Sequence, residues 1–119
     1  MTQSLEDYLE TIYNLAKENN SALVSTIASR LGVQKPSVVK AVRELKKLGL
    51  VVQEPYSVVE LTVKGSRLAK TILSRHVLIK DFLMSLGVSE RIADKDACMM
   101  EHVISAETLD KIRMSLISK

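Results

Sequence analysis

Three residues with metal-binding side chains stand close together near the C-terminus, in the segment Cys98-Met99-Met100-Glu101-His102. If this segment is helical, the i, i+3, i+4 spacing places the thiol, the carboxylate and the imidazole on one face. This mixture of soft, hard and borderline donors suits a transition metal better than calcium or magnesium. Three ligands do not close a metal site, so further donors must come from elsewhere.

The other candidate ligands are Asp7, Glu10 and His76. The two acids lie three residues apart in a predicted first helix, on the side roughly opposite its apolar stripe. His76 stands at the edge of an apolar stripe, where a partly buried imidazole needs a hydrogen bond or a metal. Each residue also has a purely structural explanation. Acidic residues in the first turn of a helix interact favourably with the helix dipole, and a histidine or Cys98 can be an ordinary residue of the packed interior. Residue types alone leave both interpretations open.

A catalytic use of the same residues has little support. A Cys-His pair one turn apart could hold a thiolate nucleophile, but the sequence supplies no oxyanion hole and no further orienting group. The His-Glu-x-x-His motif of zinc proteases is absent. A metallohydrolase built on Cys98, Glu101 and His102 would need an open coordination position and a cleft, and it would leave the basic segment unexplained. We therefore do not expect an enzyme.

Basic residues are concentrated between Ser21 and Val52. This segment carries six Lys or Arg residues and one acidic residue, a local charge of +5, whereas the chain as a whole carries +3 and the remainder −2. Such asymmetry suits a segment that binds a polyanion and is attached to a more acidic body. A solvated helix face would give the same pattern, so charge alone does not decide.

Capping residues and glycines predict a helix-turn-helix in the same region. Apolar residues recur at helical spacing after a plausible N-cap at Ser4. Ser25 is the predicted cap of a short second helix through Leu31, and Gly32 supplies the turn that ends it. Pro36 suits the first turn of a third helix, which Gly49 closes. The buried stripe of this third helix is predicted to comprise Val38, Val39, Val42, Leu45 and Leu48.

The periodicity changes to that of strands after the third helix. Residues 50–52 and 58–61 predict two strands around a turn, which together form a β-wing. Thr62 is a predicted cap for a long helix that runs to about Leu86, with Gly65 tolerated near its start. The buried stripe of this long helix is predicted to comprise Leu68, Ile72, Ile79, Leu83 and Leu86.

Two further helices are predicted after Gly87, one from Ser89 through Val103 and one opened by Ser105. The expected fold is mainly α with a small β-wing. We expect a winged helix-turn-helix DNA-binding domain over residues 1–64, followed by a helical domain over residues 65–119.

The outward side of the third helix offers candidates for DNA contact. Arginine and lysine can pair with phosphates or guanine edges, glutamine and serine can bond base edges or backbone, and a proline can press on thymine methyl groups. Tyr56 at the wing tip is a further backbone-contact candidate. The same helix could be a basic surface of a protein-binding winged helix. The candidates on the helix are Gln34, Lys35, Pro36, Ser37, Lys40, Arg43 and Lys47.

The whole chain resembles the diphtheria toxin repressor and manganese transport regulator (DtxR/MntR) family of metal-dependent transcriptional repressors. The matching pieces are weak singly but strong in this order and spacing. They are Glu6-Asp7-Tyr8-Leu9-Glu10, Ile27-Ala28-Ser29-Arg30-Leu31 with Pro36-Ser37-Val38, Leu61-Thr62-Val63-Lys64-Gly65, Arg75-His76, and the run from Cys98 to Ser105.

The resemblance implies a homodimer that binds a double-stranded DNA operator through its first three helices and wing. The later helices would form the dimer interface around the metal site, and the metal would act as corepressor for metal-homeostasis genes. The resemblance assigns Asp7, Cys98, Glu101 and His102 to one site. It assigns Glu10 and His76 to a second, adjacent one.

The chain departs from the family pattern in ways that bear on the metal. Manganese-selective members resemble it at Asp7 but have a carboxylate where Cys98 stands, whereas iron-selective members share the cysteine and have a methionine in place of the aspartate. A thiolate favours the later metals, so iron(II) is expected ahead of manganese(II). Some iron-type members place an acid near Lys80 and a histidine at Asp94, so the second site would differ in composition. The chain ends at Lys119 and so resembles the short form without an SH3-like C-terminal domain.

The expected mechanism is that metal bridges the first helix to the segment 98–102 and sets the two recognition helices of the dimer one groove repeat apart. The alternative is a winged-helix repressor that senses a non-metal signal or none. The sequence has no stretch long enough to span a bilayer and no N-terminal apolar run. We therefore expect a cytoplasmic protein with no membrane partner and no small organic substrate.

Overall fold

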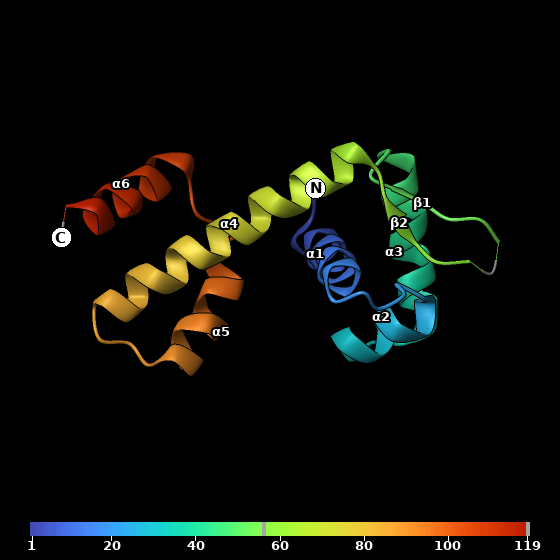
Figure 1. The fold of residues 1–119 in the computed structure, drawn as a ribbon, viewed down its shortest axis with the longest axis horizontal. Helices are drawn as coiled ribbons and strands as arrows, with labels where there is room; N and C mark the ends of the chain where they lie inside the picture. The colour runs from blue at the N-terminus through green and yellow to red at the C-terminus, as the bar shows by residue number, and fades with distance from the viewer. Residues whose placement is uncertain (56, 119) are drawn as a thin grey trace. The chain divides into compact units, whose positions relative to one another are not determined.

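The computed structural model describes residues 1–55 and 57–118 (Figure 1). Over these residues the chain forms two compact units, Met1–Lys70 and Thr71–Lys119, and α4 (Val63–Ser85) belongs to both. Tyr56, the predicted wing-tip contact, lies outside the described residues. The mainly α fold with a small wing is confirmed, while the domain boundary after residue 64 stays a prediction.

Three helices open the first unit: α1 (Gln3–Lys17), α2 (Val24–Leu31) and α3 (Lys35–Lys47). The predicted cap at Ser4 is wrong, because the Thr2 hydroxyl accepts a hydrogen bond from the Leu5 amide at 3.2 Å and α1 starts earlier. The predicted cap at Ser25 is also wrong, because Ser25 lies inside α2, which begins without a side-chain cap. Gly32 ends α2 as predicted, with a φ of +68°.

The helices α1, α2 and α3 pack on one another around an apolar core. Leu9, Ile12 and Leu15 of α1 and Ile27 of α2 are fully buried. The buried stripe of α3 consists of Val38, Ala41, Val42 and Leu45.

Two members of the predicted α3 stripe are exposed instead. Val39 is 44% and Leu48 43% exposed. Successive residues of a helix are rotated by 100°, so Val39 points well away from the buried side of α3, which carries Val38 and Leu45. Ala41 is buried on this side instead of Val39. The buried side of α3 is therefore narrower than the sequence predicted, because two of its apolar residues face solvent.

A short antiparallel sheet forms the wing as predicted. Strand β1 (Val51–Val52) pairs with β2 (Glu60–Leu61), with Val51 opposite Leu61 and Val52 opposite Glu60. The paired segments are shorter than predicted. Val59, just before β2, is buried, and its amide donates to the Ala22 carbonyl at 2.8 Å, which fastens the wing to the helices.

The start of α4 is fastened to the end of α3. The Thr62 hydroxyl accepts from the Gly65 amide at 3.0 Å and donates to the Gly49 carbonyl at 2.7 Å. Lys64 Nζ also donates to the Leu48 carbonyl at 3.2 Å. A Cβ on Gly65 would clash with the Leu50 carbonyl oxygen. The sequence prediction that Gly65 is merely tolerated is therefore wrong, because this close backbone approach requires it.

The second unit combines the rest of α4 with α5 (Glu90–Met100) and α6 (Ala106–Ile117) (Figure 1). These helices share a small core containing Ile79, Ala97 and Leu109. Ser105 caps α6 as predicted, since its hydroxyl accepts from the Thr108 amide at 3.2 Å. Among the described residues, no helix is long and apolar enough to cross a bilayer.

Ser89 is the N-cap residue of α5, although its side chain makes no capping hydrogen bond. Two predicted details of this unit are wrong. Leu86 is 64% exposed, because α4 ends at Ser85 and Gly87 turns the chain with a φ of +98°. The helix that was expected to continue through Val103 ends at Met100 and is followed by a turn.

Replacing Gly65 with alanine should destabilise the first unit by about 1–3 kcal/mol, the usual cost of forcing a methyl group into a filled space. Urea denaturation followed by circular dichroism measures the change. Lys70→Ala, an exposed position in the same helix, is the matched control and should leave the midpoint almost unchanged. Equal midpoints for the two variants would contradict the close approach to Leu50.

Candidate metal centre and DNA-binding surface

The outward face of α3 carries the residues that the sequence marked for DNA. Four of them lie in one row opposite the buried stripe, because their spacing of four, three and four residues follows the helix: Pro36, Lys40, Arg43 and Lys47. All seven candidates on this segment are exposed. The structure therefore places these side chains together on one accessible face.

The positive charge on this face is largely uncompensated. Within residues 1–55 and 57–118, the side chains of Lys35, Lys40 and Arg43 make no hydrogen bond or ion pair, and Lys47 Nζ lies 3.7 Å from Glu44 Oε1. Arg30 differs, because both of its terminal nitrogens donate to Glu18 at 3.0 Å. That hydrogen bond is the main cause of a lowered pKa of the Glu18 carboxyl. The charge available to a polyanion therefore lies on α3.

The segment after α5 brings the carboxylate and one imidazole of the predicted cluster together. Cys98 lies in the last turn of α5 and is exposed. Glu101 keeps helical backbone angles, its amide donates to the Ala97 carbonyl, and its side chain is fully buried. His102 Nε2 lies 3.3 Å from Glu101 Oε1, and the His102 side chain is only 1% exposed.

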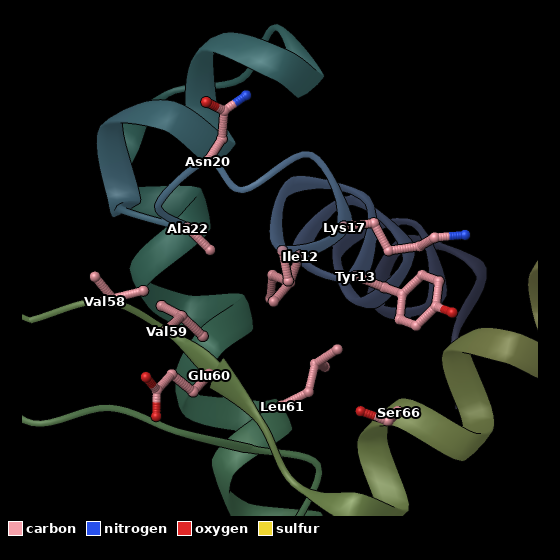
Figure 2. Close-up of a pocket in the computed structure, with 11 residues that line it drawn as sticks. Ile12, Tyr13, Lys17, Asn20, Ala22, Val58, Val59, Glu60, Leu61 and Ser66 are labelled. Atoms are coloured by element: carbon pink, nitrogen blue, oxygen red, sulfur yellow. The ribbon is translucent and has the colours of Figure 1, made fainter.

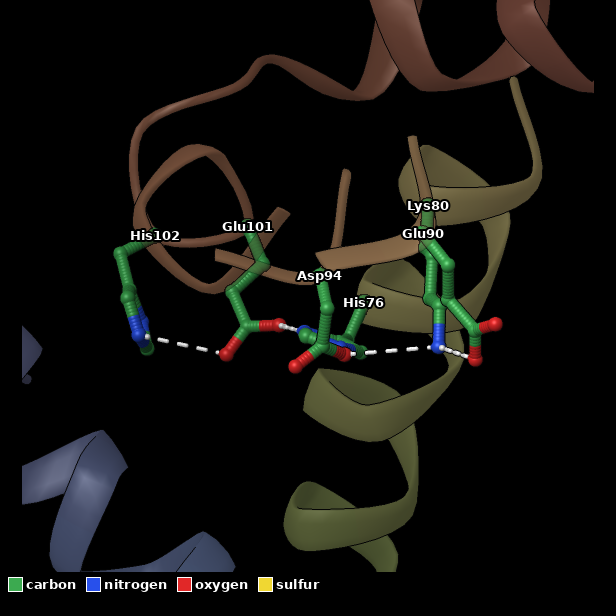
Figure 3. A network of polar contacts seen from close by, with 6 residues as sticks. All are labelled: His76, Lys80, Glu90, Asp94, Glu101 and His102. Carbon is green, nitrogen blue, oxygen red and sulfur yellow. Dashed lines mark hydrogen bonds and ion pairs between the residues drawn. The ribbon is translucent and has the colours of Figure 1, made fainter. Parts of the chain in front are cut away.

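His76 on α4 reaches the same buried carboxylate (Figure 3). Its Nδ1 lies 2.9 Å from Glu101 Oε2, and its Nε2 lies 2.8 Å from Asp94 Oδ1. The side chain of His76 is 14% exposed. Both ring nitrogens are therefore within hydrogen-bond distance of a carboxylate, one buried and one at the surface.

A lysine completes this network on its outer side. Lys80 Nζ lies 3.4 Å from Glu90 Oε1 and 3.6 Å from Asp94 Oδ1 (Figure 3). The pKa of the Asp94 carboxyl is lowered, first by the hydrogen bond with His76 and to a lesser degree by the charge of Lys80. The sequence did not predict this pairing, although His76 with Lys80 and Glu90 with Asp94 each stand one turn apart on two helices.

The donor set of the second unit fits a transition metal. A fully buried carboxylate is costly unless nearby groups compensate its charge, and Glu101 is approached by two imidazoles. Carboxylate, imidazole and thiolate together are typical ligands of iron, manganese or zinc. Asp7 and Glu10 lie three residues apart in α1 of the first unit, and both are half-buried. Their part in a metal site stays a prediction.

A separate hollow of about 400 Å³ lies in the first unit, between α1 and the strand that enters β2 (Figure 2). Ile12, Ala22 and Val59 form its apolar part. Two of the lining residues make a cation–π contact, because Lys17 Nζ lies 5.5 Å from the centre of the Tyr13 ring. No cluster of metal-binding donors from the described residues gathers in this hollow. The chemistry is concentrated on α3 and around Glu101.

Comparison with known proteins assigns a family to both parts of the chain. Residues 1–59 match the family described as "Iron dependent repressor, N-terminal DNA binding domain", and residues 62–117 match "Iron dependent repressor, metal binding and dimerisation domain". An uncharacterized HTH-type transcriptional regulator of Methanocaldococcus jannaschii is 42% identical over 116 residues, which cover 96% of this chain and 93% of the relative. The transcriptional regulator MntR of Escherichia coli is 42% identical over 110 residues, 92% of this chain and 71% of the relative.

Solved structures agree with this assignment. The structure of the manganese regulator SloR matches with a TM-score of 0.85 and 30% identity. The match covers 100% of this chain and 56% of the SloR chain, so this chain spans a little over half the length of that relative.

Replacing His76 with glutamine should raise the pKa of Asp94 towards its ordinary value of 3.8, because the hydrogen bond from the imidazole is the main cause of the lowering. The lowered pKa means that Asp94 contributes stability above pH 3.8, and this contribution disappears as the pH falls through the folded-state pKa. Carboxyl-detected NMR titration measures the shift. Arg75→Gln, at the neighbouring residue of α4, is the control, and an equal change in both variants would contradict the assignment.

Proposed function

This chain belongs to the iron-dependent repressor family of metal-dependent transcriptional repressors, and from that premise we propose that it binds a double-stranded DNA operator as a homodimer with iron(II), or manganese(II) next, as corepressor. The observation that carries the proposal is the buried Glu101 carboxylate between two imidazoles, in a chain whose α3 presents a row of cations that are largely uncompensated. Members of this family are DNA-binding regulators rather than enzymes. We propose that the genes this protein represses are those of metal homeostasis, because the metal itself is the signal.

In this proposal α3 is the recognition helix. Its apolar face is held by α1 and α2, so that the row from Pro36 to Lys47 faces outward to the major groove. Lys40, Arg43 and Lys47 supply phosphate or guanine contacts, and Gln34 and Ser37 supply polar contacts near the start of the helix. Lys46 takes another role, because its Nζ donates to the Gln53 carbonyl at 3.2 Å and holds the wing beside α3. Tyr56 remains a proposed wing contact to the DNA backbone.

The proposed metal ligands are Asp7, Cys98, Glu101 and His102. A bound divalent ion would supply a positive charge that attracts donors from α1, from the last turn of α5 and from the residues just after α5, so that loading would be coupled to ordering. Glu101 is already positioned for this role, since its second oxygen is held by His76. The resemblance assigns Glu10 and His76 to an adjacent second position.

The preference between iron and manganese rests on opposing arguments. The Cys98 thiolate favours the softer, later metal, which supports iron(II). The relatives named MntR and the manganese regulator SloR support manganese(II). We place iron(II) first because the thiolate belongs to this chain itself.

The homodimer is proposed to form through the second unit. Several large apolar side chains of that unit are exposed, among them Leu86 at 64%, Met114 at 57% and Ile117 at 77%. Exposed apolar surface of this kind is typical of a self-association face. Two copies would present two α3 helices to successive turns of the major groove. Because such a repressor acts on chromosomal DNA, the cytoplasm is its proposed location.

Arg43→Ala should weaken operator binding and lower the slope of log K against log salt concentration by about 1, because one phosphate contact and its released counterion are lost. Fluorescence anisotropy with a selected operator at several salt concentrations measures this. Lys95→Ala removes the same charge from an exposed position of α5 and should leave the slope unchanged. Equal slopes for Arg43→Ala and the unaltered protein would contradict the recognition-helix assignment.

Glu101→Ala should abolish metal-dependent operator binding, because it removes the buried carboxylate at the centre of the donor set. Anaerobic calorimetric titration with iron(II), manganese(II) and zinc(II), followed by gel shift, measures uptake and DNA binding separately. Glu107→Gln on α6 is the control, and circular dichroism checks that both variants fold. Metal-responsive binding by Glu101→Ala would contradict the assignment, and no tight uptake by the unaltered protein would favour a repressor with a non-metal signal.

Cys98→Ser should remove the thiolate-to-metal charge-transfer absorption of the cobalt(II)-loaded protein and shift selectivity from iron(II) towards manganese(II), because a hard oxygen replaces the soft donor. Optical titration with cobalt(II), and competition between iron(II) and manganese(II), measure the two effects. An unchanged cobalt spectrum would show that the thiol is not a ligand. Ser115→Ala, on α6, is the control.

A further inference from the structure

An apolar side chain stands among the cations on the surface of α3. Val39 is 44% exposed, although its spacing in the sequence predicted a buried position. Apart from Pro36 and Val39, every exposed residue of α3 is polar or charged. A single exposed valine is ordinary on a protein surface, so its significance depends on what surrounds it.

Val39 borders the outward row of α3. It lies three residues after Pro36 and four before Arg43, so these side chains are its neighbours on the helix surface. Helix geometry places Val39 about 60° around the axis from Pro36 and about 40° from Arg43. Val39 therefore extends the accessible face of α3 on one side of the row.

Two lysines lie on the other side of Val39. Lys35 precedes it by four residues and Lys46 follows it by seven, and both are exposed. Lys46 Nζ donates to the Gln53 carbonyl at 3.2 Å, so this side of α3 is the one joined to the wing segment. Val39 is thus an apolar position surrounded by basic side chains, which would be drawn to the phosphates on either side of a DNA groove.

Thymine is the base that suits such a position. Of the four bases, only thymine presents a methyl group in the major groove. Valine cannot form a hydrogen bond with a base edge or a phosphate, but its two methyl groups gain from losing water against another methyl group. A cytosine at the same position would lack the methyl group and would leave its amino donor without a partner beside valine.

We propose that Val39 is a specificity-determining residue that contacts a thymine methyl group in the major groove, so that each operator half-site prefers thymine at the base pair that Val39 faces. The inference rests on the proposed function, in which α3 is the recognition helix. Lys40 and Arg43 hold the helix in the groove, while Val39 adds discrimination between bases at a position that no charged side chain reads.

Replacing single thymines with deoxyuridine tests this contact, because uracil pairs as thymine does and lacks only the methyl group. An operator is selected with the intact protein in the presence of manganese(II), and each thymine of one half-site is then replaced in turn. Fluorescence anisotropy at fixed salt concentration measures Kd. At one thymine we expect an affinity loss of about fourfold, roughly the value of one buried methyl group.

The same series is repeated with Val39→Ala, in which the loss at that thymine should disappear. Val63→Ala is the matched control, because it removes the same two methyl groups from a residue that is 71% exposed at the start of α4. This control should keep the full sensitivity to uracil. Circular dichroism checks that both variants fold, and if Val39→Ala does not, Val39→Thr should reduce the effect at the same thymine.

Other outcomes have definite meanings. Equal sensitivity to uracil in Val39→Ala and the unaltered protein would overturn the inference, whether or not overall affinity falls, because a contact with the DNA backbone does not distinguish the two bases. Sensitivity at no thymine would overturn it as well and leave the proposed function intact. Failure of the manganese-loaded protein to select any operator would overturn the proposed function and this inference together.

A second operator selection, carried out with Val39→Ala, gives an independent readout. The preference for thymine should be lost at the position identified with deoxyuridine, while the rest of the selected operator should remain the same. A merely structural role of Val39 would weaken binding without changing the selected sequence, so an unchanged operator would overturn the inference.

Discussion

The rest of the second unit is arranged around one buried negative charge. Glu101 has no exposed surface, and a carboxylate removed from water must be compensated by hydrogen bonds or by opposite charge. Two imidazoles from different parts of the chain approach its two oxygens, His76 from α4 and His102 from the turn after α5. Asp94 holds the ring of His76, and the ring of His102 is held by burial. The position of the Glu101 carboxylate therefore depends on how α4 packs against α5.

The first unit handles charge in the opposite way. Its core is apolar, and its cations remain at the surface, where α3 lines up Lys40, Arg43 and Lys47. The neighbouring Arg30 is held by a bidentate pair with Glu18 and contributes less net charge to the surface. The chain therefore separates an exposed positive face, which suits a polyanion, from a buried negative group, which suits a metal ion.

Much of this organisation could be predicted from local rules. The helices, the wing and the turns at Gly32 and Gly87 follow from apolar periodicity and from the freedom of glycine at positive φ. The candidate ligands of the second unit followed from donor type and spacing. Asp94 and Lys80 were noted only as departures from a family pattern, because their contact with each other joins helices that only tertiary packing brings together. The need for Gly65 was missed for the same reason, since the atom that forbids a side chain there belongs to Leu50.

The junction between α3 and α4 has a mechanical consequence. Thr62 and Lys64 bind backbone carbonyls at the end of α3, and Gly65 lets the two backbones touch. The first turn of α4 is therefore fixed to the end of α3 by hydrogen bonds, and any side chain larger than hydrogen at position 65 would force these two segments apart.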